Sequence, residues 1–187
     1  MQLLGRIPNF DEPIDALEIC HENITKRMKT IAALAEQVER EGFPALQEQR
    51  ETWRELFSFI THNISKHSRD EEEGLFPMLR ATIGEKIDAL ERDHEWAEEA
   101  EHFLIKEFDA MIDGQTPTME RLATFTWRAR ELSTFYQRHI EQENSIILPA
   151  ARASLSEEQL RSLGNLMRSH RKLEIAMPKE EGRDGGV

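Results

Sequence analysis

The stretch HSRDEEEGLFP at residues 67–77 has a counterpart 72 residues later in HIEQENSIILP at residues 139–149. Each stretch has a histidine, a glutamate four residues after it and a proline six residues after that glutamate. A His-Glu dipeptide begins 46 residues before the first stretch, and another begins 45 residues before the second. The chain therefore contains two matched half-sites: His21, His67 and Glu71 in one, and His94, His139 and Glu143 in the other. Histidine and carboxylate groups doubled in this way are typical of a two-metal site inside a helical bundle.

The composition favours a single helical domain. Charged residues make up 32% of the 187 residues, while Gly and Pro number only 9 and 7, so long helices are expected. The net charge of −12 disfavours nucleic acid and anionic membranes as partners. The sequence has no apolar run of about 18 residues and no signal-peptide core, and Cys20 is its only cysteine. Together these features indicate a cytoplasmic protein without a membrane segment.

Four segments have the spacing of amphipathic helices. In residues 14–38, 53–75, 87–111 and 122–150, apolar residues recur at steps of three and four, which places them on one helix face. Signals for helix ends flank the segments: Pro13, Gly42, Pro44, Gly84, Gly114, Thr116 with Pro117, and a capping box of Ser156 with Gln159.

Short connections between these segments predict antiparallel neighbours. The predicted fold class is therefore all-α, an antiparallel up-down four-helix bundle with a short fifth helix at the C-terminal end. We expect a single domain over residues 1–177, made of an N-terminal arm (1–10), the bundle (11–153) and the fifth helix (156–173). The arm should pack on the bundle through its apolar residues. Residues 178–187 are polar and Gly-rich, which predicts a disordered tail.

The apolar residues form a stripe along one face of each predicted helix. The six His and Glu residues occupy positions in this stripe where Leu and Ile stand elsewhere. Burying a carboxylate is costly unless it is compensated, and a metal ion is the natural compensation. The acid four residues after the histidine is the only acidic position that the two stretches share. This register selects Glu71 and Glu143 as ligands and turns Glu72 about 100° away from the stripe. The histidines without a counterpart in the repeat are not expected to be ligands: His62, His102 and His170.

These residues resemble the hemerythrin-like (HHE cation-binding) family over residues 11–153. The resemblance rests on His21, on the two repeated stretches and on His94 within the tripeptide DHE. It implies a four-helix bundle with two iron ions in a non-haem di-iron centre. It also implies that the two glutamates bridge the irons and that the histidines cap them.

The chain departs from the oxygen-carrying hemerythrins in the third and fourth helices. The carriers have a second histidine where this chain has Glu98, and they use H-x4-D where this chain has H-x3-E. Glu98, or Glu101 one turn further on, is therefore a candidate seventh ligand. A ligand set richer in carboxylate favours Fe(III). Tyr136, one turn before His139, is either a core aromatic residue or a hydrogen-bond donor and redox-active phenol beside the irons.

The functional hypothesis is a di-iron protein that interacts with O2, peroxide or NO as a sensor, scavenger or carrier. The alternatives are a di-iron oxidase or peroxidase, an iron store and an iron donor for repair. A zinc hydrolase is disfavoured because no feature of the sequence indicates a substrate cleft. The sequence predicts no catalytic residue.

Overall fold

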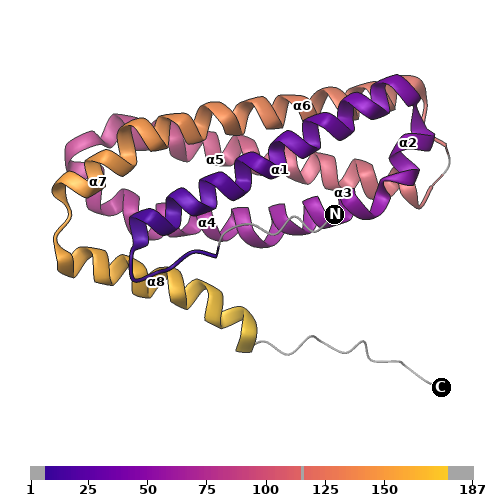
Figure 1. Cartoon of the computed structure of the whole chain (residues 1–187). Helices are drawn as coiled ribbons and strands as arrows, with labels where there is room; N and C mark the ends of the chain where they lie inside the picture. Colours follow the sequence, from indigo (N-terminus) through magenta and orange to yellow (C-terminus); the bar gives the residue numbers. More distant parts are fainter. Residues whose placement is uncertain (1–6, 115, 177–187) are drawn as a thin grey trace, which may run out of the picture.

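The protein is helical throughout apart from short connections, as shown by a computed structural model that describes residues 7–114 and 116–176 (Figure 1). No β-strand occurs in these residues. The elements in chain order are α1 (Pro13–Glu41), α2 (Phe43–Glu48), α3 (Arg50–Phe59), the π-helical turn η1 (Ile60–Ile64), α4 (Ser65–Asp70), the π-helical turn η2 (Glu71–Leu75), α5 (Phe76–Ile112), α6 (Met119–Gln142), the π-helical turn η3 (Glu143–Ile147), α7 (Leu148–Ser154) and α8 (Glu157–Ala176).

Helix α5 contains the turn between the second and third arms of the bundle. At Ile83 the backbone leaves the helical conformation, with φ −135° and ψ 34°, so α5 is two helices joined at a bend. Nδ1 of His94 lies 2.7 Å from Oε1 of Glu72, which is 22 residues earlier. In a straight helix residues this far apart would be separated by roughly 33 Å. The chain therefore reverses at Ile83, beside the turn expected near Gly84.

The four arms of the bundle are α1, the run from α2 to Ile83, the rest of α5, and the run from α6 to α7. Helix α6 packs along both α1 and α5. Helix α8 lies outside the four arms and contacts α1, α4 and η2 (Figure 1). The antiparallel bundle with an added fifth helix is the architecture that the sequence predicted.

Two apolar clusters form the core, and the candidate ligands lie between them. The first cluster includes the aromatic side chains of Trp53, Phe57, Phe108 and Phe125. The second includes Leu17, Phe76, Leu90, Leu148 and Met167. On α1, His21 lies between Leu17 of the second cluster and Ile24 of the first. Close packing on both sides fixes the backbone that carries the ligands.

The π-helical turns η2 and η3 begin at the two repeated glutamates, and each is followed by a helix with proline in its first turn. Proline has no N–H, and its ring clashes with the carbonyl four residues earlier, so the wider turn accommodates it. The extra residue moves the buried face along by one position. As a result Ile147, Leu148 and Ala151 are buried, while the predicted stripe residues Ile146 and Ala150 are only half-buried. The prediction for these last two residues was wrong for this reason.

Most predicted helix ends are confirmed. Helix α1 begins at Pro13 and ends at Gly42, whose φ of 77° favours glycine. The capping box before α8 is present: the Ser156 N–H donates to Gln159 Oε1 at 2.9 Å, and the Gln159 N–H donates to Ser156 Oγ at 3.3 Å. One cap was misplaced. Thr118, not Thr116, caps α6, accepting a hydrogen bond from the N–H of Arg121.

The N-terminal arm is described from residue 7 onward. Phe10 packs against the second apolar cluster, whereas Ile7 is 90% exposed. The other apolar residues predicted to pack the arm on the bundle, Leu3 and Leu4, lie outside the described residues, as does the predicted disordered tail at residues 178–187.

None of the helices in the described part of the chain is both long enough and apolar enough to cross a membrane.

Candidate metal centre

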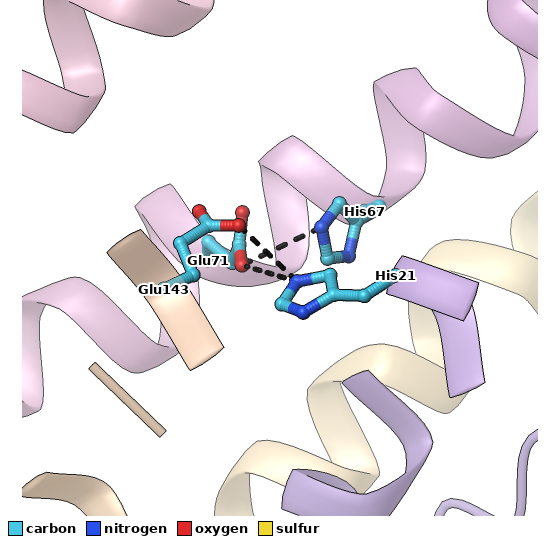
Figure 2. Close-up of side chains that lie close together, drawn as sticks. All are labelled: His21, His67, Glu71 and Glu143. Carbon is cyan, nitrogen blue, oxygen red and sulfur yellow. Dashed lines mark ion pairs between the residues drawn. The ribbon is translucent and has the colours of Figure 1, made fainter. Parts of the chain in front are cut away.

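The structure brings all six repeated His and Glu side chains together inside the bundle. They come from α1, α4, η2, α5, α6 and η3, and none is more than 7% exposed. Figure 2 shows four of them, which point toward one another: His21, His67, Glu71 and Glu143. The ligand atoms form two groups, each within 4.8 Å of one another: His21, His67, Glu71 and Glu143 in one, and His94, His139 and Glu143 in the other.

In the first group both glutamates face the imidazole of His21. Its Nε2 lies 3.7 Å from Oε1 of Glu71 and 3.2 Å from Oε2 of Glu143 (Figure 2). Nε2 of His67 lies 3.5 Å from the same Oε1 of Glu71. Two imidazoles and two carboxylates therefore converge on one point.

Toward His94 and His139 the two glutamates present their other oxygens. Oε1 of Glu143 lies 3.0 Å from Nε2 of His139 and 4.0 Å from Nε2 of His94. Oε2 of Glu71 lies 3.5 Å from the same nitrogen of His94. Each glutamate thus divides its two oxygens between the two pairs of histidines. This is the arrangement that a carboxylate bridging two cations would require.

The buried polar atoms of the centre fit a pair of cations. Among the described residues, nine buried side-chain N and O atoms lack a hydrogen-bond partner, and seven of these belong to His21, His67, Glu71 and Glu143. Orphaned buried polar atoms are rare in folded proteins because each one costs the free energy of its lost hydration. Six of the seven, all except Nδ1 of His67, are converging atoms, and their concentration at one point is explained if they are ligands. Imidazole with carboxylate suits iron and similar divalent or trivalent metals.

Residues that were not predicted from the sequence orient the histidines through their outer ring nitrogens. Glu72 Oε1 lies 2.7 Å from Nδ1 of His94, and Asn144 Oδ1 lies 2.7 Å from Nδ1 of His21. A signal was available, because Glu72 and Asn144 each follow the repeated glutamate and are themselves 72 residues apart. Partners of this kind fix the orientation of a metal-binding imidazole.

The outer contacts of the other two histidines differ from each other. Asp93 Oδ2 lies 3.4 Å from Nδ1 of His139. Nδ1 of His67, by contrast, has no hydrogen-bond partner among the described residues. The two half-sites are therefore alike in their inner side chains and unlike in what supports them.

The side chains of the centre compete for protons. Burial lowers the pKa of His21, but the carboxylates of Glu143 and Glu71 outweigh burial and raise it to about 10. In His139 burial is likewise outweighed by the charge of Glu143, and the pKa is raised to about 9. Burial and the charge of Glu143 raise the pKa of Glu71 to about 7. Burial, with the charge of His21, lowers the pKa of His67 well below its usual value. A cation that binds here must displace the shared protons.

Glu98 and Glu101 lie outside both groups of converging atoms. Glu98 is exposed, and Glu101 is half-buried. Both line a cavity of about 540 Å³ that also borders His94 and Tyr136. The Tyr136 hydroxyl donates to Oε1 of Glu101 at 2.6 Å, and burial raises the pKa of that carboxyl to about 7. The phenol is thus directed at Glu101, while its ring packs edge-on against His139 at 6.2 Å between centroids.

Helix α8 clamps the segment that carries the first half-site. Asp70, the residue before η2, is fully buried. Its Oδ1 lies 2.8 Å from Nδ1 of His170, and its Oδ2 lies 2.8 Å from Nη1 of Arg171, both on α8. Gly74 in η2 allows this approach, because a Cβ there would lie 2.6 Å from Cδ1 of Leu163. The sequence did not predict this role of His170, whose partner lies 100 residues away.

Residues 12–151 match the model of the hemerythrin HHE cation binding domain, and the chain belongs to this family. The family bundle ends before α8. The chain is 24% identical over 178 residues to an uncharacterized protein of Haemophilus influenzae, a match that covers 92% of this chain and 99% of that protein. It is also 30% identical over 103 residues to the iron-sulfur cluster repair protein YtfE of Musicola paradisiaca, covering 50% of this chain and 44% of that protein. The protein is therefore a hemerythrin-like cation-binding protein with buried His/Glu sites.

Proposed function

We propose that this protein holds two iron ions in a non-haem di-iron centre and uses them to interact with O2, peroxide or NO, as a sensor, scavenger or carrier. The proposed ligands are His21, His67, Glu71, His94, His139 and Glu143. The observation that carries the proposal is the division of each glutamate's two oxygens between the two histidine pairs. Bound iron would supply redox equivalents and open positions for a small ligand.

The chain's own residues contribute shape and support. The two apolar clusters exclude water above and below the centre. Glu72, Asp93 and Asn144 hold three of the imidazoles in orientation. Four imidazoles and two carboxylates leave coordination positions free on two six-coordinate ions, so a small molecule could bind without displacing a protein ligand.

An iron store or iron donor is the second candidate. It is favoured by the similarity of half the chain to a protein named for iron-sulfur cluster repair. The cavity beside His94 also suits passage of a cation, because its lining includes Glu72, Glu91, Glu95 and Glu98. A di-iron oxidase or peroxidase is a further alternative, in which Tyr136 and Glu101 would form a proton-accepting pair near the centre.

The test begins with protein produced in iron-replete medium. We expect two iron ions per chain by elemental analysis, and an optical spectrum that changes on reduction and again on exposure to O2, peroxide or NO. One ion per chain, or mainly zinc, would contradict the di-iron proposal. Rapid transfer of iron to a cluster-free acceptor protein, without a stable adduct of any small ligand, would favour the donor. Multiple turnovers of peroxide would favour the enzyme.

A further inference from the structure

A groove on the face between α5 and α6 combines aromatic side chains with arginines. It has a volume of about 710 Å³, and its lining includes Trp96, Trp127, Phe135, Arg130 and Arg138. Trp127 is 55% exposed, which makes it one of three large hydrophobic side chains that are exposed in the described part of the chain. Exposed tryptophan beside arginine is the composition of protein-binding hot spots rather than of ordinary surface.

The wall of the groove is in ring contact with the metal centre. The Trp96 and Phe135 rings lie 4.4 Å apart between centroids. The Phe135 ring in turn stacks on the imidazole of His139, with centroids 5.7 Å apart and planes 18° apart. Asp93, which also lines the groove, holds the outer nitrogen of the same histidine. The rings of Trp96 and Phe135 therefore connect the wall of the groove to the ring of His139, a proposed iron ligand.

Two arginines, Arg130 and Arg138, and two acids, Asp93 and Glu131, line the groove, and all of these charges except that of Arg138 have a partner among the described residues. The guanidinium of Arg128 lies 5.1 Å from the Trp127 ring centroid and also pairs with Glu131 at 2.7 Å. Arg130 pairs with Glu39. Arg138 lies over the Phe135 ring at 5.5 Å and makes no ion pair with any described residue. The groove thus offers an exposed cation in a chain whose net charge is −12.

The cavity at His94, which also lies beside the centre, differs from the groove in its charge. The charged lining of the cavity at His94 includes five glutamates and one arginine, Arg69, so its excess of negative charge would repel an acidic protein. An acidic partner that approaches the centre would therefore be directed to the face with Arg138. Like charges elsewhere on this chain would oppose docking in other orientations.

We infer that this groove is the docking site of a small acidic one-electron carrier protein, which exchanges electrons with the centre through Trp96, Phe135 and His139. The inference rests on the di-iron function proposed above. In the step, one electron leaves the reduced cofactor of the carrier, which becomes oxidised, and one ferric ion of the centre becomes ferrous. No bond of the protein is made or broken. Arg138 pairs with an acidic group of the carrier, and Trp127 packs in its interface.

The test uses the iron-loaded chain and a plant-type [2Fe–2S] ferredoxin as the acidic carrier. Binding of oxidised ferredoxin is measured by calorimetry, and reduction of the ferric centre by reduced ferredoxin is followed by stopped flow. Arg138→Glu should weaken binding and slow reduction by about tenfold or more at low ionic strength, and added salt should narrow the difference. Trp127→Ala should weaken binding at all salt concentrations. The matched control is Arg161→Glu, the same charge change on exposed α8, which should leave both readouts within about twofold of wild type.

Dithionite separates the failure of this inference from that of the proposed function. All variants should contain two irons and be reduced by dithionite at the wild-type rate, because this small ion needs no docking site. A chain without two reducible irons would overturn the proposed function. Intact iron would overturn the docking site alone if ferredoxin neither binds nor reduces the centre, or if Arg138→Glu equals Arg161→Glu. Self-association that Trp127→Ala abolishes, measured by sedimentation, would assign the groove to a second copy of this chain instead.

Discussion

At the scale of single residues, the centre depends on where each glutamate directs its oxygens. Oε1 of Glu71 faces His21 and His67, and its Oε2 faces His94. Replacing it with a shorter residue would therefore remove a ligand atom from both metals at once. Glu72, its neighbour, contacts the centre only through the outer nitrogen of His94. Spacing separated the two adjacent acids correctly, but it gave Glu72 no role.

This difference gives a graded prediction for three glutamates. Glu71→Ala should abolish binding of both irons. Glu72→Ala should keep them but lower the affinity by about 10–100-fold, because the partner of a metal-binding imidazole is lost. Glu98→Ala, the matched exposed control, should keep both irons at wild-type affinity. Elemental analysis after dialysis against graded chelator would measure all three, and loss of iron in Glu98→Ala would make Glu98 a seventh ligand.

At the scale of elements, the positions of the π-helical turns explain which buried residues the sequence predicted correctly and which it did not. The register from His67 to Glu71, and from His139 to Glu143, is ordinary α-helix, so steps of three and four placed the ligands on the buried face. One turn later, in η3, the register changes, and the predicted burial of Ile146 was wrong by one residue. The cause is the proline that follows each of these turns, which a reading of hydrophobic periodicity does not take into account.

The contacts that support the ligands were the least predictable part of the site. Glu72 and Asn144 carry a signal in the repeat, because they share a position after the ligand glutamate. Asp70 and His170 carry none, since they meet only when α8 folds across the bundle. Long-range polar pairs of this kind depend on tertiary packing, which a single sequence does not encode in any local pattern.

The clamp formed by α8 makes a prediction about stability. His170→Ala leaves the carboxylate of Asp70, which is fully buried, with one partner fewer. We expect the free energy of unfolding to fall by about 2–4 kcal/mol, because the buried carboxylate keeps its desolvation cost with Arg171 as its remaining partner. Urea denaturation of the metal-free protein would measure the change. His102→Ala, an exposed control, should cost less than about 0.5 kcal/mol.

A double substitution separates the pair from general damage to α8. With Asp70→Asn already present, adding His170→Ala should cost less than it does in the wild type, because the buried charge that His170 compensates has been removed. Equal costs in the two backgrounds would show that His170 contributes packing and not compensation of Asp70. In that case α8 would act as an apolar cover only.

At the scale of the whole molecule, the family bundle and the helix beyond it act together. The matched family domain ends at residue 151, yet α8 reaches back to the turn that carries Glu71. The bundle supplies the proposed ligands, and α8 contacts one of the segments that carry them. We therefore expect a chain that lacks α8 to bind metal less tightly even if the four-helix bundle itself folds.

The protons shared by the centre couple metal binding and stability to pH. The pKa of His21 is raised from 6.5 to about 10, so its bound proton stabilises the metal-free fold fully below pH 6.5 and that stabilisation is lost as pH rises toward 10. His139 behaves alike, with its loss complete near pH 9. The pKa of Glu71 is raised from 4.5 to about 7, so its contribution to stability also falls as pH rises, between pH 4.5 and pH 7. Metal-free protein should therefore lose stability from this cluster as pH rises from 6 to 9.

The bound cation replaces these protons, so the metal-loaded protein should be far less sensitive to pH over the same range. We expect the difference in Tm between loaded and metal-free protein to widen from pH 6 to pH 9, by up to about 5 °C per pH unit for each proton displaced. Calorimetry at matched ionic strength, with Zn²⁺ as a redox-inert substitute for iron, would measure it. In the metal-free protein, Glu143→Gln removes the main carboxylate that raises the pKa of His21 and His139, so its Tm should vary less with pH. A Tm difference that narrows as pH rises would show that the histidines enter the folded centre unprotonated, and that binding metal releases no protons from them.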